Sequence, residues 1–250
     1  MIAALGMYDM PATAQANDRF WSLTRSALGF GPERLTRDRD MWDVWTHPDL
    51  VLAQTCGMPY RTKLQGQVQL VGTPDYGLPG CPPGHYCSVF VARRTDQRDL
   101  SELIDGVFGY NESLSQSGWA APITHLAGQN LKPETLLETG GHANSAHAVA
   151  NEQADVASLD ALTWTMLQEH TKLGEQLREV ARTPPTPTLP YITAPKQDPD
   201  RIAHAVRSAI NELSDQDRRL LHLKDLTQIP TEKYLSVPNP PSPEAIVATN

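Results

Sequence analysis

The stretch 111–118, Asn-Glu-Ser-Leu-Ser-Gln-Ser-Gly, combines residue types that can bind an anion. Ser115 and Ser117 flank Gln116, Gly118 follows at once, and the next residues can begin a helix. The unpaired N–H groups and the positive dipole end of a helix start attract an anion without any Lys or Arg. The stretch therefore predicts an oxyanion site, although either serine could instead only cap its own helix.

Three segments resemble the phosphonate-binding proteins of ABC transporters, a branch of the type 2 periplasmic-binding-protein fold. The signature of that family is an acidic residue, a proline, a variable residue, Ser-Thr-Ser-Gly, and a further proline four residues on. The matching positions here are Glu112, Ser113, Leu114, Ser115, Gln116, Ser117, Gly118 and Pro122. Segments 84–91 and 141–157 resemble the family's inter-lobe strand and its downstream strand–helix–strand unit.

The resemblance implies a two-lobed α/β protein with a ligand cleft between the lobes, which closes by hinge bending. It also implies a non-enzymatic solute-binding protein for a small oxyanion or phosphonate-like ligand, with no cofactor and with an ABC transporter permease as partner. Three positions depart from the signature: Glu112 replaces Asp, Ser113 replaces Pro and Gln116 replaces Thr. Because an amide offers both a donor and an acceptor, we expect Gln116 to alter the choice of ligand.

Hydrophobic periodicity indicates a parallel-rich α/β architecture, since strand patterns alternate with helical ones. Strand patterns occur at 2–7, 50–55, 68–71 and 86–91, and helical patterns at 12–28 and 200–213. Two chain crossings are expected, near 91–95 and near the Pro-rich stretch 183–194. Residues 1–92 with 190–250 would then form lobe 1, and 93–189 would form lobe 2.

Ligands of open α/β sheets bind outside the carboxyl ends of strands. Residues at or past the carboxyl ends of predicted strands are Tyr8, Gln54, Thr55, Tyr60 and Asp160, and the resemblance adds Tyr86 and His142 as cleft residues. Each has a plainer interpretation. Tyr8 and Tyr60 could pack inside a lobe, His142 could be structural, and Asp160 could cap the helix 161–170 rather than bind the amine of a ligand.

Composition excludes several classes of protein. A net charge of −8 disfavours a nucleic-acid binder, and no apolar run approaches the roughly 18 residues of a membrane span. The N-terminus enters a strand pattern without a signal peptide, so the sequence as written predicts a cytoplasmic protein, or a periplasmic one if the true start lies upstream. We expect a monomer.

Enzyme signals are weak, because no Walker loop, nucleophile elbow or metal-ligand spacing is present. Three cysteines cannot form a complete disulfide framework. Two alternatives stay open: an enzyme on the same fold, of the thiamin-precursor or menaquinone-pathway type, with Cys56 as a possible nucleophile, and a ligand-sensing domain acting on a partner protein.

Overall fold

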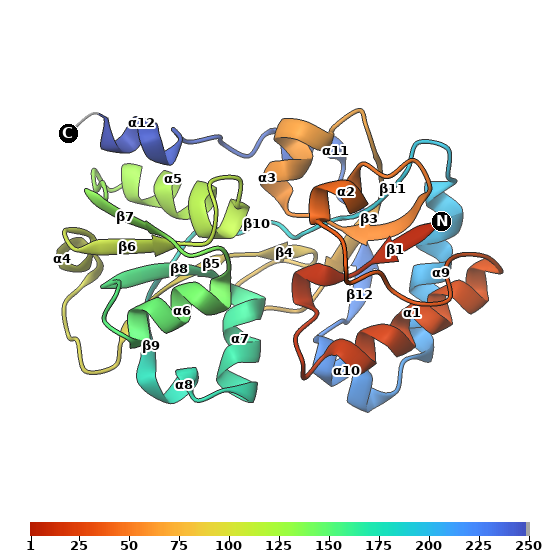
Figure 1. Ribbon diagram of the computed structural model, residues 1–250, viewed down its shortest axis with the longest axis horizontal. Helices are drawn as coiled ribbons and strands as arrows, with labels where there is room; N and C mark the ends of the chain where they lie inside the picture. The colour runs from red at the N-terminus through yellow and green to blue at the C-terminus, as the bar shows by residue number, and fades with distance from the viewer. Residues whose placement is uncertain (249–250) are drawn as a thin grey trace. The chain divides into compact units, whose positions relative to one another are not determined.

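The computed structural model describes residues 1–248 as two compact units, each built around a five-stranded sheet (Figure 1). Unit 1 comprises Met1–His85 and Pro187–Leu235, and unit 2 comprises Tyr86–Thr186 with the C-terminal tail from Ser236 onward. The sequence placed this tail with the first lobe. The structure groups it with unit 2, where Ile246 is buried in the hydrophobic core.

Unit 1 has the strand order β1-β2-β11-β3-β12. The strands are β1 (Ile2–Ala4), β2 (Leu50–Gln54), β3 (Gln69–Asp75), β11 (Tyr191–Thr193) and β12 (Asp225–Thr227). The helices are η1 (Gly6–Tyr8), α1 (Ala14–Leu28), α2 (Met41–Trp45), α3 (Gly57–Pro59), η2 (Tyr60–Leu64), α9 (Pro199–Glu212), α10 (Asp215–Leu221) and α11 (Thr231–Leu235).

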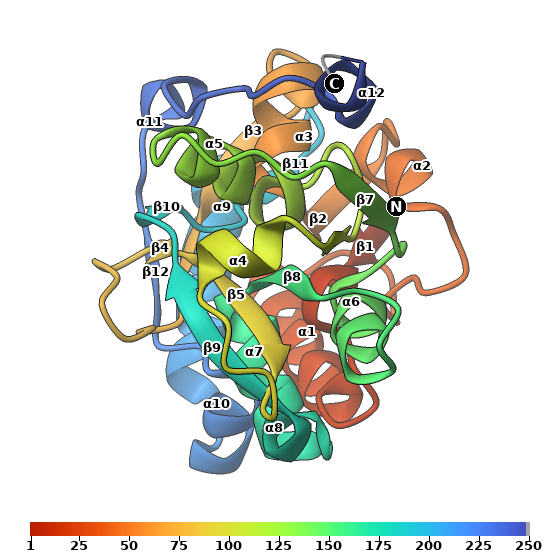
Figure 2. The same cartoon turned by 90° about the vertical axis from the view of Figure 1, so that its left-hand side faces the viewer.

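Unit 2 has the strand order β7-β6-β8-β5-β9. The strands are β5 (Ser88–Arg93), β6 (Val107–Tyr110), β7 (Thr135–Glu138), β8 (Val156–Asp160) and β9 (Leu177–Arg182). The helices are α4 (Leu100–Ile104), η3 (Gln116–Ala120), α5 (Ala121–Ala127), α6 (His142–Ala150), α7 (Ala161–His170), α8 (Leu173–Gln176) and α12 (Pro243–Val247). Helices α5 and α12 lie over one face of the sheet, and α6 and α7 lie over the other (Figures 1 and 2).

Both sheets are mixed, so the expectation of a parallel-rich architecture was wrong in this respect. Strand β1 is parallel to β2, and β6 is parallel to β7 and β8. Strand β11 is antiparallel to β2 and β3, and β5 is antiparallel to β8 and β9. The short strand β10 (Thr186–Pro187) lies between β9 and β11 in the chain and pairs with β4 (His85–Tyr86) in a separate two-stranded sheet.

Local sequence signals define the helix ends. Helix α9 begins after Asp198, whose carboxylate accepts hydrogen bonds from the Asp200 and Arg201 N–H groups, with Pro199 at its first position. Helix α1 ends at Gly29, which takes the left-handed conformation with a φ of 77°. Within residues 1–248, no helix combines the length and apolarity needed to cross a bilayer.

Candidate functional site

The carboxyl ends of the parallel strands β6, β7 and β8 place three segments at one edge of the unit 2 sheet. Strand β6 leads into the turn 111–118, β7 leads to His142, and β8 ends at Asp160. Parallel neighbours end at the same edge, so residues far apart in sequence meet there. This arrangement creates the candidate site from residues that the sequence singled out.

The serine turn, residues 115–118, opens the helix η3 that continues into α5. Ser115 has an extended backbone, and its Oγ accepts a hydrogen bond from the Gly118 N–H at 2.9 Å. Ser115 is therefore a helix cap, and the Gly118 amide, which the sequence assigned to an anion, donates to Ser115 instead. The Ser115 hydroxyl still has its own proton to donate.

Ser117 is bonded to a histidine 25 residues away. Its Oγ lies 2.9 Å from His142 Nε2, and its carbonyl accepts a hydrogen bond from Ser158 Oγ at 2.8 Å. Desolvation lowers the pKa of His142 to about 4, an effect partly offset by the backbone of Ser158. The imidazole is thus neutral at neutral pH, and Ser117 and His142 form an uncharged pair of hydrogen-bonding groups.

Gly118 allows the close approach of Asn111 to the serine turn. A Cβ at Gly118 would lie 1.8 Å from Asn111 Oδ1 and 2.8 Å from Asn111 Cγ, so only glycine fits beside this side chain. Asn111 Oδ1 is buried, and no hydrogen-bond donor reaches it from any residue that the structure describes. The contact between Asn111 and Gly118 fixes the turn to the end of β6.

The other candidate residues of unit 2 are buried. Asp160 Oδ1 accepts hydrogen bonds from the Leu162 and Thr163 N–H groups at 2.8 and 2.9 Å, so its carboxylate caps α7. Tyr86, on strand β4 (His85–Tyr86), is 1% exposed, and Gln116 is 2% exposed. Sequence reasoning did not single out Ser158, which lies on β8.

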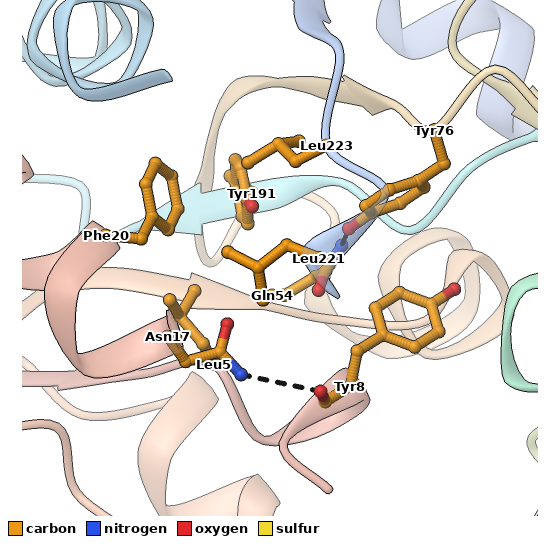
Figure 3. A pocket seen from close by; sticks show the side chains of 9 residues that line it. All are labelled: Leu5, Tyr8, Asn17, Phe20, Gln54, Tyr76, Tyr191, Leu221 and Leu223. Carbon is orange, nitrogen blue, oxygen red and sulfur yellow. Dashed lines mark hydrogen bonds between the residues drawn. The ribbon is translucent and has the colours of Figure 1, made fainter. Parts of the chain in front are cut away.

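The candidate residues of unit 1 fall into two groups, of which the first surrounds a small pocket (Figure 3). Tyr8 packs edge-on against Tyr76 with ring centroids 5.3 Å apart, and Gln54 Nε2 donates to the Tyr76 hydroxyl at 2.9 Å. Tyr191 and Asn17 also line the pocket. The cavity of about 10 Å³ has room for about one water molecule. Tyr76 was missed because it lies in a Pro/Gly-rich loop that carries no strand or helix pattern.

Tyr60 belongs to the second group, inside the hydrophobic core of unit 1. It packs edge-on against Tyr234 with centroids 5.3 Å apart, and its hydroxyl lies 3.3 Å from Thr231 Oγ1. Thr55, the residue after β2, is fully buried, and its Oγ1 has no hydrogen-bond partner among residues 1–248. In the same described part of the chain, no group of three or more His, Cys, Asp or Glu side chains could hold a metal ion.

Comparison with known proteins gives a family and a fold. Residues 51–231 match the family described as ABC transporter, phosphonate, periplasmic substrate-binding protein. No protein of curated function matches the sequence. The fold is similar to that of PhnD1 from Prochlorococcus marinus in complex with methylphosphonate, with a TM-score of 0.75 and 14% identity over 93% of both chains.

Two further solved structures have a similar fold. One is a binding protein component of an ABC phosphonate transporter from Pseudomonas aeruginosa, with a TM-score of 0.70 and 16% identity over 93% of this chain and 82% of that chain. The other is a Xanthomonas citri protein bound to ATP, with a TM-score of 0.67 and 14% identity over 99% and 94%. The α/β fold of the type 2 periplasmic-binding-protein class, predicted from the sequence, is confirmed.

The contact between Gly118 and Asn111 predicts the effect of adding one methyl group. We expect Gly118→Ala to displace Asn111 and to lower the free energy of unfolding by roughly 1–3 kcal/mol, measured by chemical denaturation. Gly128→Ala is the matched control, because its Cβ would meet no atom closer than 3.4 Å and its φ of −65° suits alanine. Equal losses in the two variants would contradict this description of the turn.

The lowered pKa of His142 predicts a pH dependence of stability. Between pH 6.5 and about 4 the unfolded chain binds a proton at His142 that the folded chain does not bind, so stability falls as the pH falls through this range. We expect His142→Gln to flatten that part of the curve of melting temperature against pH. The same substitution at His204, exposed on α9, is the control. Parallel curves for wild type and His142→Gln would show that this imidazole is not desolvated.

Proposed function

Because the chain belongs to the family of phosphonate periplasmic substrate-binding proteins of ABC transporters, we propose that it binds a small oxyanion or phosphonate-like ligand at the serine turn of unit 2. The chain is a solute-binding protein rather than an enzyme, as the family is. The observation that carries the proposal is the pair formed by Ser117 Oγ and His142 Nε2 at a helix start. An uncharged hydroxyl–imidazole pair beside backbone N–H groups is suited to an anion.

Several uncharged donors would hold the ligand. Ser115 and Ser117 each have a hydroxyl proton, and the first backbone N–H groups of η3 lie beside them. A hydrogen bond to a charged group contributes roughly 1.5–3 kcal/mol, and a micromolar dissociation constant corresponds to about 8 kcal/mol. Three or four such bonds contribute roughly 4.5–12 kcal/mol, a range that includes the value for micromolar binding without a lysine or arginine among the assigned groups.

The neutral state of His142 matters for this mechanism. A neutral imidazole can accept the Ser117 hydroxyl proton or donate its own, as the tautomer allows. The Ser117 hydroxyl can then turn to donate to the ligand while its oxygen accepts from His142. With a pKa of about 4, His142 keeps this flexibility over the whole physiological range.

Gln116 and the buried residues around the turn would set ligand choice. Gln116 is 2% exposed. Its amide offers donors and an acceptor at the position where the family signature has the hydroxyl of a threonine. Tyr86, on β4, would cover the ligand. The proposal does not depend on Tyr8 or Tyr60, which have aromatic packing partners in unit 1, nor on Asp160, which caps α7.

The similar structures suggest which ligands to test. One is described in complex with methylphosphonate and another bound to ATP, and both ligands present oxygens on phosphorus. We propose that the chain recognises the same chemical group, that it works in the periplasm as the family description states, and that it delivers its ligand to an ABC transporter permease. Release of the native protein by osmotic shock tests the location.

The binding proposal is tested by isothermal titration with methylphosphonate, aminoethylphosphonate, phosphate, phosphite, sulfate and ATP. We expect one phosphorus oxyanion to bind the wild type, and Ser117→Ala to weaken it roughly 10- to 150-fold through loss of one hydrogen bond to a charged group. Ser208→Ala, whose hydroxyl is exposed and donates to Glu212, is the control and should bind as the wild type does.

Two results would contradict the proposal: no binding of any of these anions, or equal binding by wild type and Ser117→Ala. Gln116→Thr, titrated with the same ligands, tests the role of the amide. We expect it to change the rank order of the anions, and an unchanged order would remove Gln116 from ligand selection.

A further inference from the structure

The C-terminal tail, residues 236–248, is a third passage of the chain between the two units. It leaves unit 1 after α11, which ends at Leu235, and belongs to unit 2 from Ser236 onward. In Figure 1 this segment runs from α11 to α12 as the dark blue end of the chain. We name residues 236–248 the strap.

The strap is anchored in unit 2 to the residue that follows the serine turn. Trp119 is fully buried, and its Nε1 donates a hydrogen bond to the Pro241 carbonyl at 3.0 Å. Ile246 on α12 is 6% exposed and lies in the same hydrophobic cluster as Trp119. Ser242 caps α12, and Pro243 occupies its first position. The strap is therefore attached to unit 2 by a hydrogen bond to Trp119 and by the burial of Ile246 in the cluster that contains Trp119.

The segment that precedes the strap is anchored in unit 1. Tyr234, next to the last residue of α11, is 1% exposed, and its hydroxyl bonds to the Thr188 carbonyl at 2.8 Å and to Thr73 Oγ1 at 2.7 Å. Its ring packs edge-on against Tyr60. These hydrogen bonds and the aromatic packing hold the Tyr234 side chain in one position within unit 1.

The linker between the two anchors is short and rich in proline. Seven residue steps separate Tyr234 from Pro241, and they span at most about 25 Å when fully extended. The intervening sequence Leu-Ser-Val-Pro-Asn-Pro contains two prolines before Pro241. Such linkers are semi-rigid spacers.

Trp119 connects the strap to the serine turn. It follows Gly118 directly in the sequence, and its N–H donates to the Ser115 carbonyl at 3.2 Å. Its ring also lies 4.8 Å from that of Tyr110, the last residue of β6. A shift of the indole therefore acts on both ends of the segment 110–119.

We propose that the strap is a positioning device: docked on Trp119, it holds the serine turn in its binding geometry. Trp119 and Ile246 are positioning residues, because neither is assigned to the ligand. The consequence for ligand affinity rests on the proposed function, whereas the effect on the turn itself does not.

The test that needs no ligand is amide hydrogen exchange of segment 111–118. We expect Trp119→Phe, which keeps an aromatic ring and loses the bond to Pro241, to speed exchange there roughly fivefold. Deletion of residues 236–250 should have a larger effect. Trp164→Phe is the matched control, because Trp164 is equally buried in unit 2 and its Nε1 donates to Glu179 Oε1 at 2.9 Å. That variant should leave segment 111–118 unchanged.

Unchanged exchange of segment 111–118 in Trp119→Phe and in Ile246→Ala would overturn the proposal. If the deletion variant does not fold, these two variants alone test the proposal. Titration of the same variants with methylphosphonate and with phosphate provides the second arm, in which we expect weaker binding for Trp119→Phe and wild-type binding for Trp164→Phe. Failure of the wild type to bind any anion would refute the proposed function alone, because the exchange experiment would still report on the strap.

Discussion

The hydrogen bond between Ser117 and His142 depends on parallel strands that end at one edge of a sheet. Each of the two residues follows a different strand of unit 2, and 25 residues separate them in the sequence. The pairing of β6 with β7 and β8 brings the two segments together. Buried groups then fix the arrangement: Ser158 holds the Ser117 carbonyl, Ser115 caps the helix, and Asn111 fits against Gly118.

Burial and the absence of charge on His142 together define the chemistry of the site. An imidazole whose pKa is lowered to about 4 cannot attract an anion as a cation would. Recognition must instead come from directed O–H and N–H donors, which discriminate between oxyanions by geometry and protonation state more than by net charge. The global charge of −8 is compatible with this, because backbone and hydroxyl dipoles act locally.

The sequence predicted local features better than long-range ones. The serine turn before a helix and the capping role open to Asp160 could be foreseen, because caps are set by a few neighbouring residues. The pairing of Ser117 with His142 and the docking of the tail on Trp119 could not, since they depend on tertiary contacts that leave no local pattern. For the same reason Tyr60 could not be distinguished from a ligand contact until its packing against Tyr234 was seen.

The most direct test of the binding site is a crystal structure of the protein grown with methylphosphonate. We expect a phosphonate oxygen within about 3.2 Å of Ser117 Oγ, with His142 Nε2 still bonded to that hydroxyl. A ligand bound elsewhere, with Ser115 and Ser117 making only the hydrogen bonds described above, would show that the serine turn is a structural cap and not the binding site.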